Sequence, residues 1–228
     1  MSDEHPVGGS EDRRIARLRA LLILDTEAEP IFDTLARLAS EACNTPVALL
    51  SLVDAGRQWF KANVGLAGVT ETPRSVAFCD HAIRGDQVME VPDALADPRF
   101  AGNPHVMGAP NIRFYAGAPL VMSTGERVGT LCVIDREARR LTADQIRQLE
   151  DLARLSVQAL EMRERSIQQS LEVRSAHEHA VADSERRLRA ILDAQSELVS
   201  QSTPDGHLLY VNPAYAAFVG RCVDEIIG

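Results

Sequence analysis

The stretch of the sequence most suggestive of chemistry is Cys79-Asp-His81. A cysteine can act as a nucleophile when a nearby base takes its proton, and histidine is the usual base. Residues two apart on a helix point to different sides, so this spacing does not place the imidazole beside the thiol. Nothing in the sequence indicates the depressed pKa that a reactive thiol needs. We therefore expect no catalytic residue here.

Two histidines, His81 and His105, could join Cys79 in binding a metal ion or a haem iron. Their spacing matches no common ligand pattern, and an isolated histidine is more often an ordinary core or surface residue. The four cysteines are scattered without a CxxC pair, which is typical of buried thiols in a reducing compartment. We expect no metal site and no cofactor.

Other motifs also lack what their chemistry needs. The pair His177-Glu178 resembles the phospho-acceptor motif of histidine kinases, but the residues that follow do not continue that motif. A solvated helix face explains the pair better. The sequence contains neither GxxxxGK[ST] nor GxGxxG, so nucleotide binding through those loops is not expected.

Glycine and proline divide the chain into three parts. Eight of the eleven prolines lie between Pro30 and Pro119, whereas residues 130–203 contain neither glycine nor proline. Because these two residue types break helices and mark turns, this distribution predicts a compact part, a long uninterrupted helix and a short tail. The boundaries are expected near residues 12, 160 and 195.

The compact part alternates helical and strand-like patterns. Helices are expected near residues 15–22 and after Pro30, which suits a first helical position. Residues 47–53 are apolar on both faces, so they predict a central strand, and 57–64 follow as its hairpin partner. A short strand at 88–91 and a hairpin of 112–120 with 128–134 complete an antiparallel sheet. The fold class is α+β, with helices flanking that sheet.

Several motifs in this part carry a family resemblance, and they occur in a consistent order. They are Leu24-Asp-Thr26, Val53-Asp-Ala-Gly-Arg-Gln-Trp-Phe-Lys61, Phe78-Cys-Asp-His-Ala-Ile83, Val91-Pro-Asp93, Asp97-Pro-Arg-Phe-Ala101, Ile112-Arg-Phe-Tyr-Ala-Gly-Ala-Pro-Leu120 and Gly129-Thr-Leu-Cys-Val-Ile-Asp135. Together they resemble the GAF domains at the N-terminus of bacterial sensor histidine kinases and cyclic-dinucleotide enzymes, over residues 13–160.

The resemblance implies a ligand pocket between the sheet and the irregular excursion at residues 92–110. Most of the ten aromatic residues lie in this part of the chain, and they could wall such a pocket. A core packed without a ligand is the alternative. GAF photoreceptors carry a bilin-binding cysteine that this region lacks, so a covalent chromophore is not expected. The candidate pocket residues are Phe78, Cys79, His81, Asp93, Arg99, Phe100, Phe114 and Tyr115.

The uninterrupted part predicts one long helix from Ala143 to about Gln195. Thr142 and Gln145 stand at capping-box spacing at its start. Apolar residues recur at alternating steps of three and four, which favours a parallel coiled-coil homodimer. A single amphipathic helix folded back on its own domain is the alternative. The expected dimer interface comprises Val157, Leu160, Ile167, Leu171, Val181, Leu188 and Leu192.

The tail looks like the opening of a PAS domain. Its motifs are Ser184-Glu-Arg-Arg-Leu-Arg-Ala-Ile-Leu192, Thr203-Pro-Asp-Gly206, Tyr210-Val-Asn-Pro213 and Asp224-Glu-Ile-Ile-Gly228. Only about the first third of a PAS domain is present, so this α/β segment is incomplete. The expected organisation is a disordered N-terminus at 1–12, a GAF sensor domain at 13–160, a signalling helix at 161–194 and a PAS fragment at 195–228.

Composition excludes some classes of function. The net charge is -9 over 228 residues, and no stretch supplies the basic patch that nucleic acid binding needs. The polar, acidic N-terminus is unlike a secretion signal, and no apolar run approaches the roughly 18 residues of a membrane span. We expect a cytoplasmic protein that binds neither nucleic acid nor a membrane.

These features predict the sensory module of a bacterial signal-transduction protein, such as a two-component system, and not an enzyme. An unknown small molecule or a change of conformation would act through the dimeric helix on an output domain outside this chain. A structural dimerisation module without a ligand is one alternative. A cysteine-dependent reductase is another, because some GAF-type proteins reduce methionine sulfoxide, although their multi-cysteine pattern is absent here.

Overall fold

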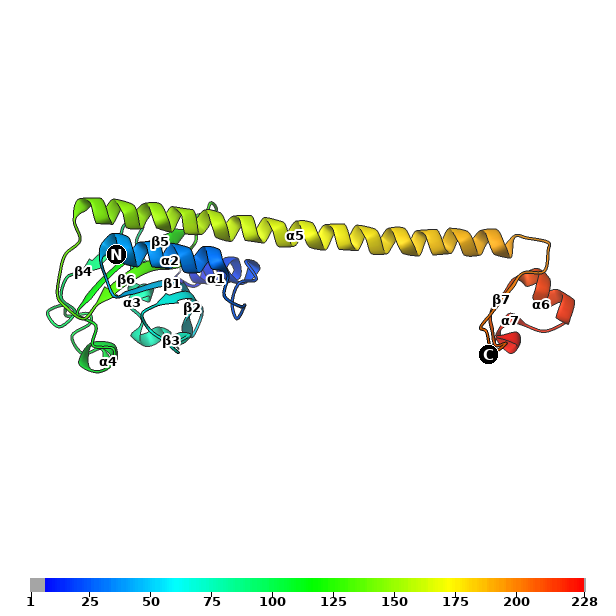
Figure 1. The fold of residues 1–228 in the computed structure, drawn as a ribbon, viewed down its shortest axis with the longest axis horizontal. Helices are drawn as coiled ribbons and strands as arrows, with labels where there is room; N and C mark the ends of the chain where they lie inside the picture. The colour runs from blue at the N-terminus through cyan, green and yellow to red at the C-terminus, as the bar shows by residue number, and fades with distance from the viewer. Residues whose placement is uncertain (1–6, 228) are drawn as a thin grey trace, which may run out of the picture. The chain divides into compact units, whose positions relative to one another are not determined.

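The computed structural model describes residues 7–227, which form two compact units that meet within one helix at Ser166 and Ile167. Figure 1 shows the elements of both units in chain order. The first unit contains a six-stranded sheet, and the second contains the far half of the helix and the tail. No helix in the described residues is long and apolar enough to cross a membrane.

The sheet is antiparallel throughout, with the strand order β3-β2-β1-β6-β5-β4. All seven residues of β1 are buried, so it lies centrally as its continuous apolar pattern predicts. Both predicted hairpins are confirmed, whereas the short edge strand β3 was not predicted. The strands are β1 (Val47–Val53), β2 (Arg57–Val64), β3 (Glu71–Pro73), β4 (Met89–Val91), β5 (Phe114–Val121) and β6 (Arg127–Asp135).

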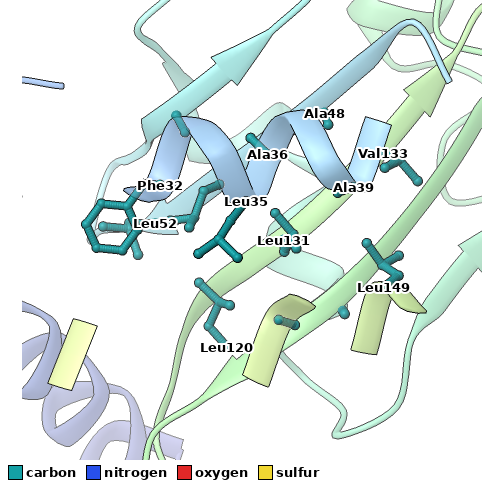
Figure 2. Close-up of a cluster of buried hydrophobic side chains, with 14 of the residues drawn as sticks. Phe32, Leu35, Ala36, Ala39, Ala48, Leu52, Leu120, Leu131, Val133 and Leu149 are labelled. Carbon is teal, nitrogen blue, oxygen red and sulfur yellow. The ribbon is translucent and has the colours of Figure 1, made fainter. Parts of the chain in front are cut away.

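Helices cover one face of the sheet. Helices α1 (Val7–Ala20), α2 (Pro30–Cys43) and the first part of α5 (Ala143–Asp193) share a core with alternate residues of the strands. Figure 2 shows α2 lying across this face above β1 and β6. The core includes Phe32, Leu35, Ala39, Ala48, Leu52, Leu131 and Leu149.

The opposite face is covered by short and irregular elements. They are the 3₁₀ helix η1 (Arg74–Val76), helix α3 (Phe78–Ala82), helix α4 (Pro104–Met107) and the loops between them. A second core lies here and uses the other set of alternate strand residues. The expected irregular excursion over one sheet face is therefore confirmed for residues 92–110.

Helix α5 begins where its capping box predicts. The Thr142 amide donates to Gln145 Oε1 at 3.0 Å, and the Gln145 amide donates to Thr142 Oγ1 at 3.2 Å. The helix then runs unbroken for 51 residues, from Ala143 to Asp193. Four of its residues are buried in the first unit at helical spacing: Leu149, Ala153, Ser156 and Leu160.

The expected dimer interface needs a correction at its N-terminal end. Leu160 is 1% exposed within the core of its own domain, and Val157 packs against the same core. The start of the apolar stripe therefore packs against its own domain. This is the arrangement expected from the alternative, in which the helix folds back on its own domain. Between Leu171 and Leu188 the stripe is exposed, with these two residues at 56% and 57%, whereas Leu192 is half-buried.

The second unit is organised around Asn212, whose side chain is fully buried. Its amide nitrogen donates to the carbonyls of Leu192, Gln195 and Glu197, and its oxygen accepts from the amides of Val199 and Tyr215. One side chain thus ties the end of α5 to the tail. The tail elements are β7 (Ser200–Ser202), β8 (Leu208–Val211), α6 (Pro213–Val219) and α7 (Val223–Ile226).

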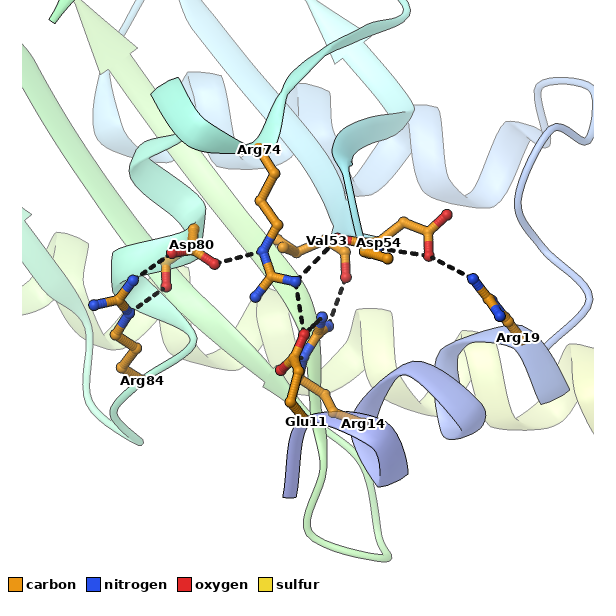
Figure 3. A network of polar contacts seen from close by, with 9 residues as sticks. Glu11, Arg14, Arg19, Val53, Asp54, Arg74, Asp80 and Arg84 are labelled. Carbon is orange, nitrogen blue, oxygen red and sulfur yellow. Dashed lines mark hydrogen bonds and ion pairs between the residues drawn. The ribbon is translucent and has the colours of Figure 1, made fainter. Parts of the chain in front are cut away.

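The N-terminal helix begins earlier than expected. Residues 7–12 belong to α1, so the expected disorder is wrong for them, while residues 1–6 lie outside the described residues. Figure 3 shows the polar network that holds α1. The Glu11 carboxylate accepts from Arg14 at 2.7 Å and from Arg74 at 2.6 Å, and Arg14 also donates to the Val53 carbonyl at 2.5 Å. Arg74 continues the network to Asp80 at the start of α3.

The network gives the stability of the first unit a defined dependence on acid pH. Hydrogen bonds from Arg14 and Arg74 lower the pKa of Glu11 from 4.5 to about 2, although partial burial opposes them. Because the folded pKa lies below the unfolded one, this stabilisation is complete above pH 4.5 and is lost as pH falls towards 2. Glu11→Gln should lower the free energy of unfolding at pH 7 by about 1 kcal/mol. The loss is no larger because water screens the half-exposed side chain.

Chemical denaturation of Glu11→Gln and the native protein between pH 7 and pH 2 checks this prediction. The difference in unfolding free energy should shrink to zero towards pH 2. The exposed Glu137→Gln provides the control. An equal difference at all pH values would contradict the assigned pKa of Glu11.

Candidate functional site

A cavity of about 250 Å³ lies between the sheet and the irregular segments on its second face. Its walls are mostly apolar and come from β1, β2, β5, β6, the start of α3 and the loop around the cis peptide bond before Pro110. Its mouth lies near Val69 and Ala109, which are exposed. Apolar wall residues include Leu49, Phe60, Leu66, Phe78, Ile112 and Ile134.

Two polar atoms in the walls have no hydrogen-bond partner among the described residues. They are Oε1 of Gln58 and Nε2 of His105. Gln58 is only 6% exposed, so its amide oxygen has lost water without gaining a protein donor. An unsatisfied buried polar group costs about 1–3 kcal/mol. These two atoms are therefore suited to hydrogen bonding with an occupant of the cavity.

Two cysteines from distant parts of the chain meet in the cavity wall. The sulfur of Cys79 on α3 lies 3.8 Å from the sulfur of Cys132 on β6. The Cys79 sulfur also accepts hydrogen bonds from the hydroxyls of Tyr115 at 3.3 Å and Thr130 at 3.0 Å. All four side chains are buried. The thiol of Cys79 is thus surrounded by hydrogen-bond donors.

These donors change the acidity of Cys79. Burial alone would raise the pKa of the thiol, but the hydrogen bonds with Cys132, Thr130 and Tyr115 outweigh burial and lower it from 9.0 to about 7. The cause is the stabilisation of the thiolate by donors held around it. The hydrogen bond between the two thiols and the burial of Cys132 both raise the pKa of Cys132. Cys79 is therefore the more acidic member of the pair.

Gly117 allows the tyrosine hydroxyl to reach this cluster. Tyr115 and Gly117 are two residues apart on β5, so both face the cavity side of the sheet. A Cβ atom at position 117 would lie 2.1 Å from the Tyr115 hydroxyl oxygen. A side chain there would force the phenol away from Cys79.

Three of the eight candidate pocket residues line the cavity: Phe78, Cys79 and Tyr115. Phe100 lies behind Phe78, with stacked rings 4.1 Å apart, and supports it without lining the cavity. The prediction is wrong for Phe114, which faces the helix-covered core because successive strand residues alternate between the two faces.

The three expected polar contacts also lie outside the cavity. His81 packs edge-on against Phe100 and borders a separate polar depression. Asp93 pairs with Arg113 at 2.9 Å, and Arg99 pairs with Asp97 at 2.6 Å. Each carboxylate and guanidinium is therefore satisfied by a neighbour at the surface.

Sequence reasoning missed Gln58 and Cys132 and considered His105 only as a metal ligand. A polar residue at an inward position of a buried strand was the available signal for Gln58. No comparable signal pairs Cys79 with Cys132, which are 53 residues apart. In the part of the chain that the structure describes, no three His, Cys, Asp or Glu residues gather as a metal site would require.

Comparison with known proteins identifies relatives of the first unit. The family model of the GAF domain matches residues 27–160. A cyclic di-GMP phosphodiesterase of Pseudomonas aeruginosa is 46% identical over 151 residues, which are 66% of this chain and 26% of that protein. The chain thus spans about a quarter of the length of this relative.

Solved structures of GAF domains are similar at lower identity. The blue-light absorbing form of the PixJ GAF domain from Thermosynechococcus elongatus has a TM-score of 0.48 and 17% identity, covering 77% of this chain and 99% of that one. The GAF domain of an Acinetobacter phosphoenolpyruvate-protein phosphotransferase has a TM-score of 0.48 and 16% identity, covering 71% and 95%.

The acidity of Cys79 can be tested through its tyrosine donor. Tyr115→Phe removes one hydrogen bond to the thiolate, which should raise the pKa of Cys79 by about one unit, since such bonds contribute about 1.5 kcal/mol. The ultraviolet absorbance of the thiolate, titrated with pH in a Cys222→Ser background, measures this shift. Tyr210→Phe, at the exposed phenol of the second unit, is the control. An unchanged midpoint in Tyr115→Phe would refute the role of this donor.

Proposed function

The chain belongs to the GAF domain family, and we propose that it senses a small molecule in the cavity beside Gln58 and relays binding through α5. The observation that carries this proposal is the pair of unsatisfied atoms, Gln58 Oε1 and His105 Nε2, in an otherwise apolar cavity. A ligand that donates to the amide oxygen and bonds to the imidazole would satisfy both. Such a cavity, apolar with a few polar groups, is typical of small-molecule sites.

Strand β2 connects the cavity to the other face of the sheet. Gln58 and Phe60 line the cavity, whereas the neighbouring Lys61 extends into the helix-covered side, 5.6 Å from the Phe32 ring. The Lys61 ammonium is buried and donates to Thr26 Oγ1, to the Glu27 carbonyl and to Glu29. A buried ammonium is stable only with such partners, so its position is tied to theirs.

Glu29 links Lys61 to α5. Its carboxylate accepts from Lys61 at 2.8 Å and from Arg163 at 2.7 Å. Arg163 also donates to the carbonyls of Leu21 and Leu22 at 3.0 Å. A shift of β2 on ligand binding would therefore act on the helix at Arg163, near the end of the first unit.

A second ion pair lies beside the first. Arg17 on α1 donates through both terminal nitrogens to Glu164, at 2.5 and 2.7 Å. Both side chains are mostly buried, and the two-pronged geometry fixes their orientation. Residues 163 and 164 thus hold α5 near the end of the first unit, and a change in either pair would alter the direction in which the helix continues.

Beyond this turn, a second copy of the chain is the proposed partner of α5. Leu171, Val181 and Leu188 are 56%, 44% and 57% exposed and share one stripe of a long helix. A parallel coiled coil would bury this stripe. The signal would then pass to the tail, proposed as the start of a PAS domain, and to an output domain beyond it. The relative named as a cyclic di-GMP phosphodiesterase supports an output enzyme for that nucleotide.

Replacement of the unsatisfied glutamine tests ligand binding. Gln58→Leu removes the buried acceptor, so the ligand-free protein should become more stable by about 1–3 kcal/mol. The same variant should lose the rise in Tm that a bound small molecule causes. Thermal shift against nucleotides, amino acids and carboxylic acids measures both effects, with the exposed Gln87→Leu as the control. Unchanged ligand shifts in Gln58→Leu would remove the support for this site.

Carboxylates on the exposed stripe test the dimer. Leu171→Asp with Leu188→Asp should convert the protein to monomer, because paired helices would bury unpartnered charges. Light scattering after size-exclusion chromatography gives the mass. Val173→Asp is the matched control, since Val173 is 64% exposed but lies off the stripe. Equal dissociation in the control, or none in the double variant, would contradict the proposed interface.

A further inference from the structure

We propose that Cys79 and Cys132 form a peroxide-responsive switch, in which hydrogen peroxide entering the cavity links the two sulfurs in a reversible disulfide. The pair is a modification site in the wall of the cavity, and its oxidation does not require the proposed ligand to exist. A small thiol would restore the reduced state.

The geometry favours bond formation between these two cysteines. Their sulfurs are 3.8 Å apart, whereas a disulfide bond is about 2.05 Å long. Closing the gap needs a movement of about 2 Å. Cys132 lies on β6 within the sheet, but Cys79 lies on α3, which has only five residues and is followed by the exposed Arg84 and Gly85. The short helix is therefore the element that would move.

The hydroxyl cluster prepares Cys79 for attack. Thiolates, and not thiols, react with peroxide. The Cys79 sulfur accepts hydrogen bonds from Tyr115 and Thr130, and these bonds lower the pKa of the thiol, so that the thiolate forms more readily than from an ordinary cysteine. Cys43 provides the contrast inside the same domain: it is also buried, and burial raises its pKa to about 11.

A peroxide molecule fits the site. Both sulfurs line the cavity of about 250 Å³. Hydrogen peroxide needs roughly 60 Å³, twice the share of one water molecule. The exposed Val69 and Ala109 mark the mouth through which it would enter.

The reaction balances in two steps. The Cys79 thiolate attacks one oxygen of the peroxide, the O–O bond breaks, and the leaving hydroxide takes a proton to become water. Cys79 is then a sulfenic acid. Cys132 gives up its proton as its sulfur attacks the Cys79 sulfur, the S–S bond forms, and the S–O bond breaks. The departing hydroxyl leaves as water with the proton of Cys132, so two thiols and one peroxide yield one disulfide and two waters.

Oxidation would reshape the cavity. Phe78 lines it directly beside Cys79 in the chain, so a movement of α3 towards β6 would move that aromatic wall. The disulfide would also release the hydroxyls of Tyr115 and Thr130 from their thiolate acceptor. The redox state of the pair would thus change both the shape and the polarity of the site.

The experiment uses the full chain with Cys222→Ser, which removes the one exposed cysteine of the described residues. The folded protein is treated with a few equivalents of hydrogen peroxide, alkylated and analysed by mass spectrometry. We expect the loss of two hydrogen atoms, a linked peptide joining Cys79 to Cys132, an alkylated Cys43, and full reversal by dithiothreitol.

Two variants identify the order of the steps. Cys132→Ser should trap Cys79 as a sulfenic acid that dimedone captures, and Cys79→Ser should leave Cys132 as a thiol. Protein unfolded in guanidinium before oxidation serves as the control, because Cys43 should then compete for pairing.

Exposed methionines report the peroxide dose. Met107 and Met162 are 68% and 70% exposed, and oxidation converts them to sulfoxides. The proposal is overturned if Cys79 and Cys132 remain thiols after these methionines are oxidised. Sulfinic acid at Cys79 without a bond to Cys132, or equal pairing with Cys43 in the folded protein, would overturn it as well.

Discussion

The whole domain depends on two central strands, β1 and β6, that are buried on both faces. A sheet with two apolar faces must be covered twice, since exposed apolar surface is unfavourable in water. Long helices cover one face closely, because each presents a continuous apolar stripe. The other face is covered by short helices and loops, which carry polar backbone and cannot fill the space as evenly. The cavity forms on that second face.

Exclusion of water gives the groups around this cavity their properties. The same low polarity that leaves the Gln58 oxygen unsatisfied also strengthens the hydrogen bonds that reach the Cys79 sulfur. Cys79 and Phe78 belong to one short helix and to one cavity wall. Ligand occupancy and thiol oxidation would therefore influence each other, because both act on the position of that helix.

Charged groups join the sheet to the long helix on the opposite side. An isolated buried ammonium would be very unfavourable, so Lys61 requires Glu29, and Glu29 in turn holds Arg163. Lys61 is the fully buried member of this chain of ion pairs, and without Glu29 it would be a buried charge with no anionic partner. The chain of ion pairs is therefore suited to two defined arrangements and not to gradual movement.

The sequence by itself determined the features that depend on local pattern. The apolar run of β1 predicted a central strand, and the capping pair of Thr142 and Gln145 predicted where α5 begins, because neighbours along the chain decide both. Only the tertiary structure decided that Cys79 contacts Cys132 and that no donor reaches the Gln58 amide oxygen. It also decided that Leu160 is buried in the core of the first unit. These outcomes depend on strand register and on how distant segments pack. An apolar stripe on a helix can pack against the core of its own domain or against a partner chain, and the sequence pattern is the same in both cases.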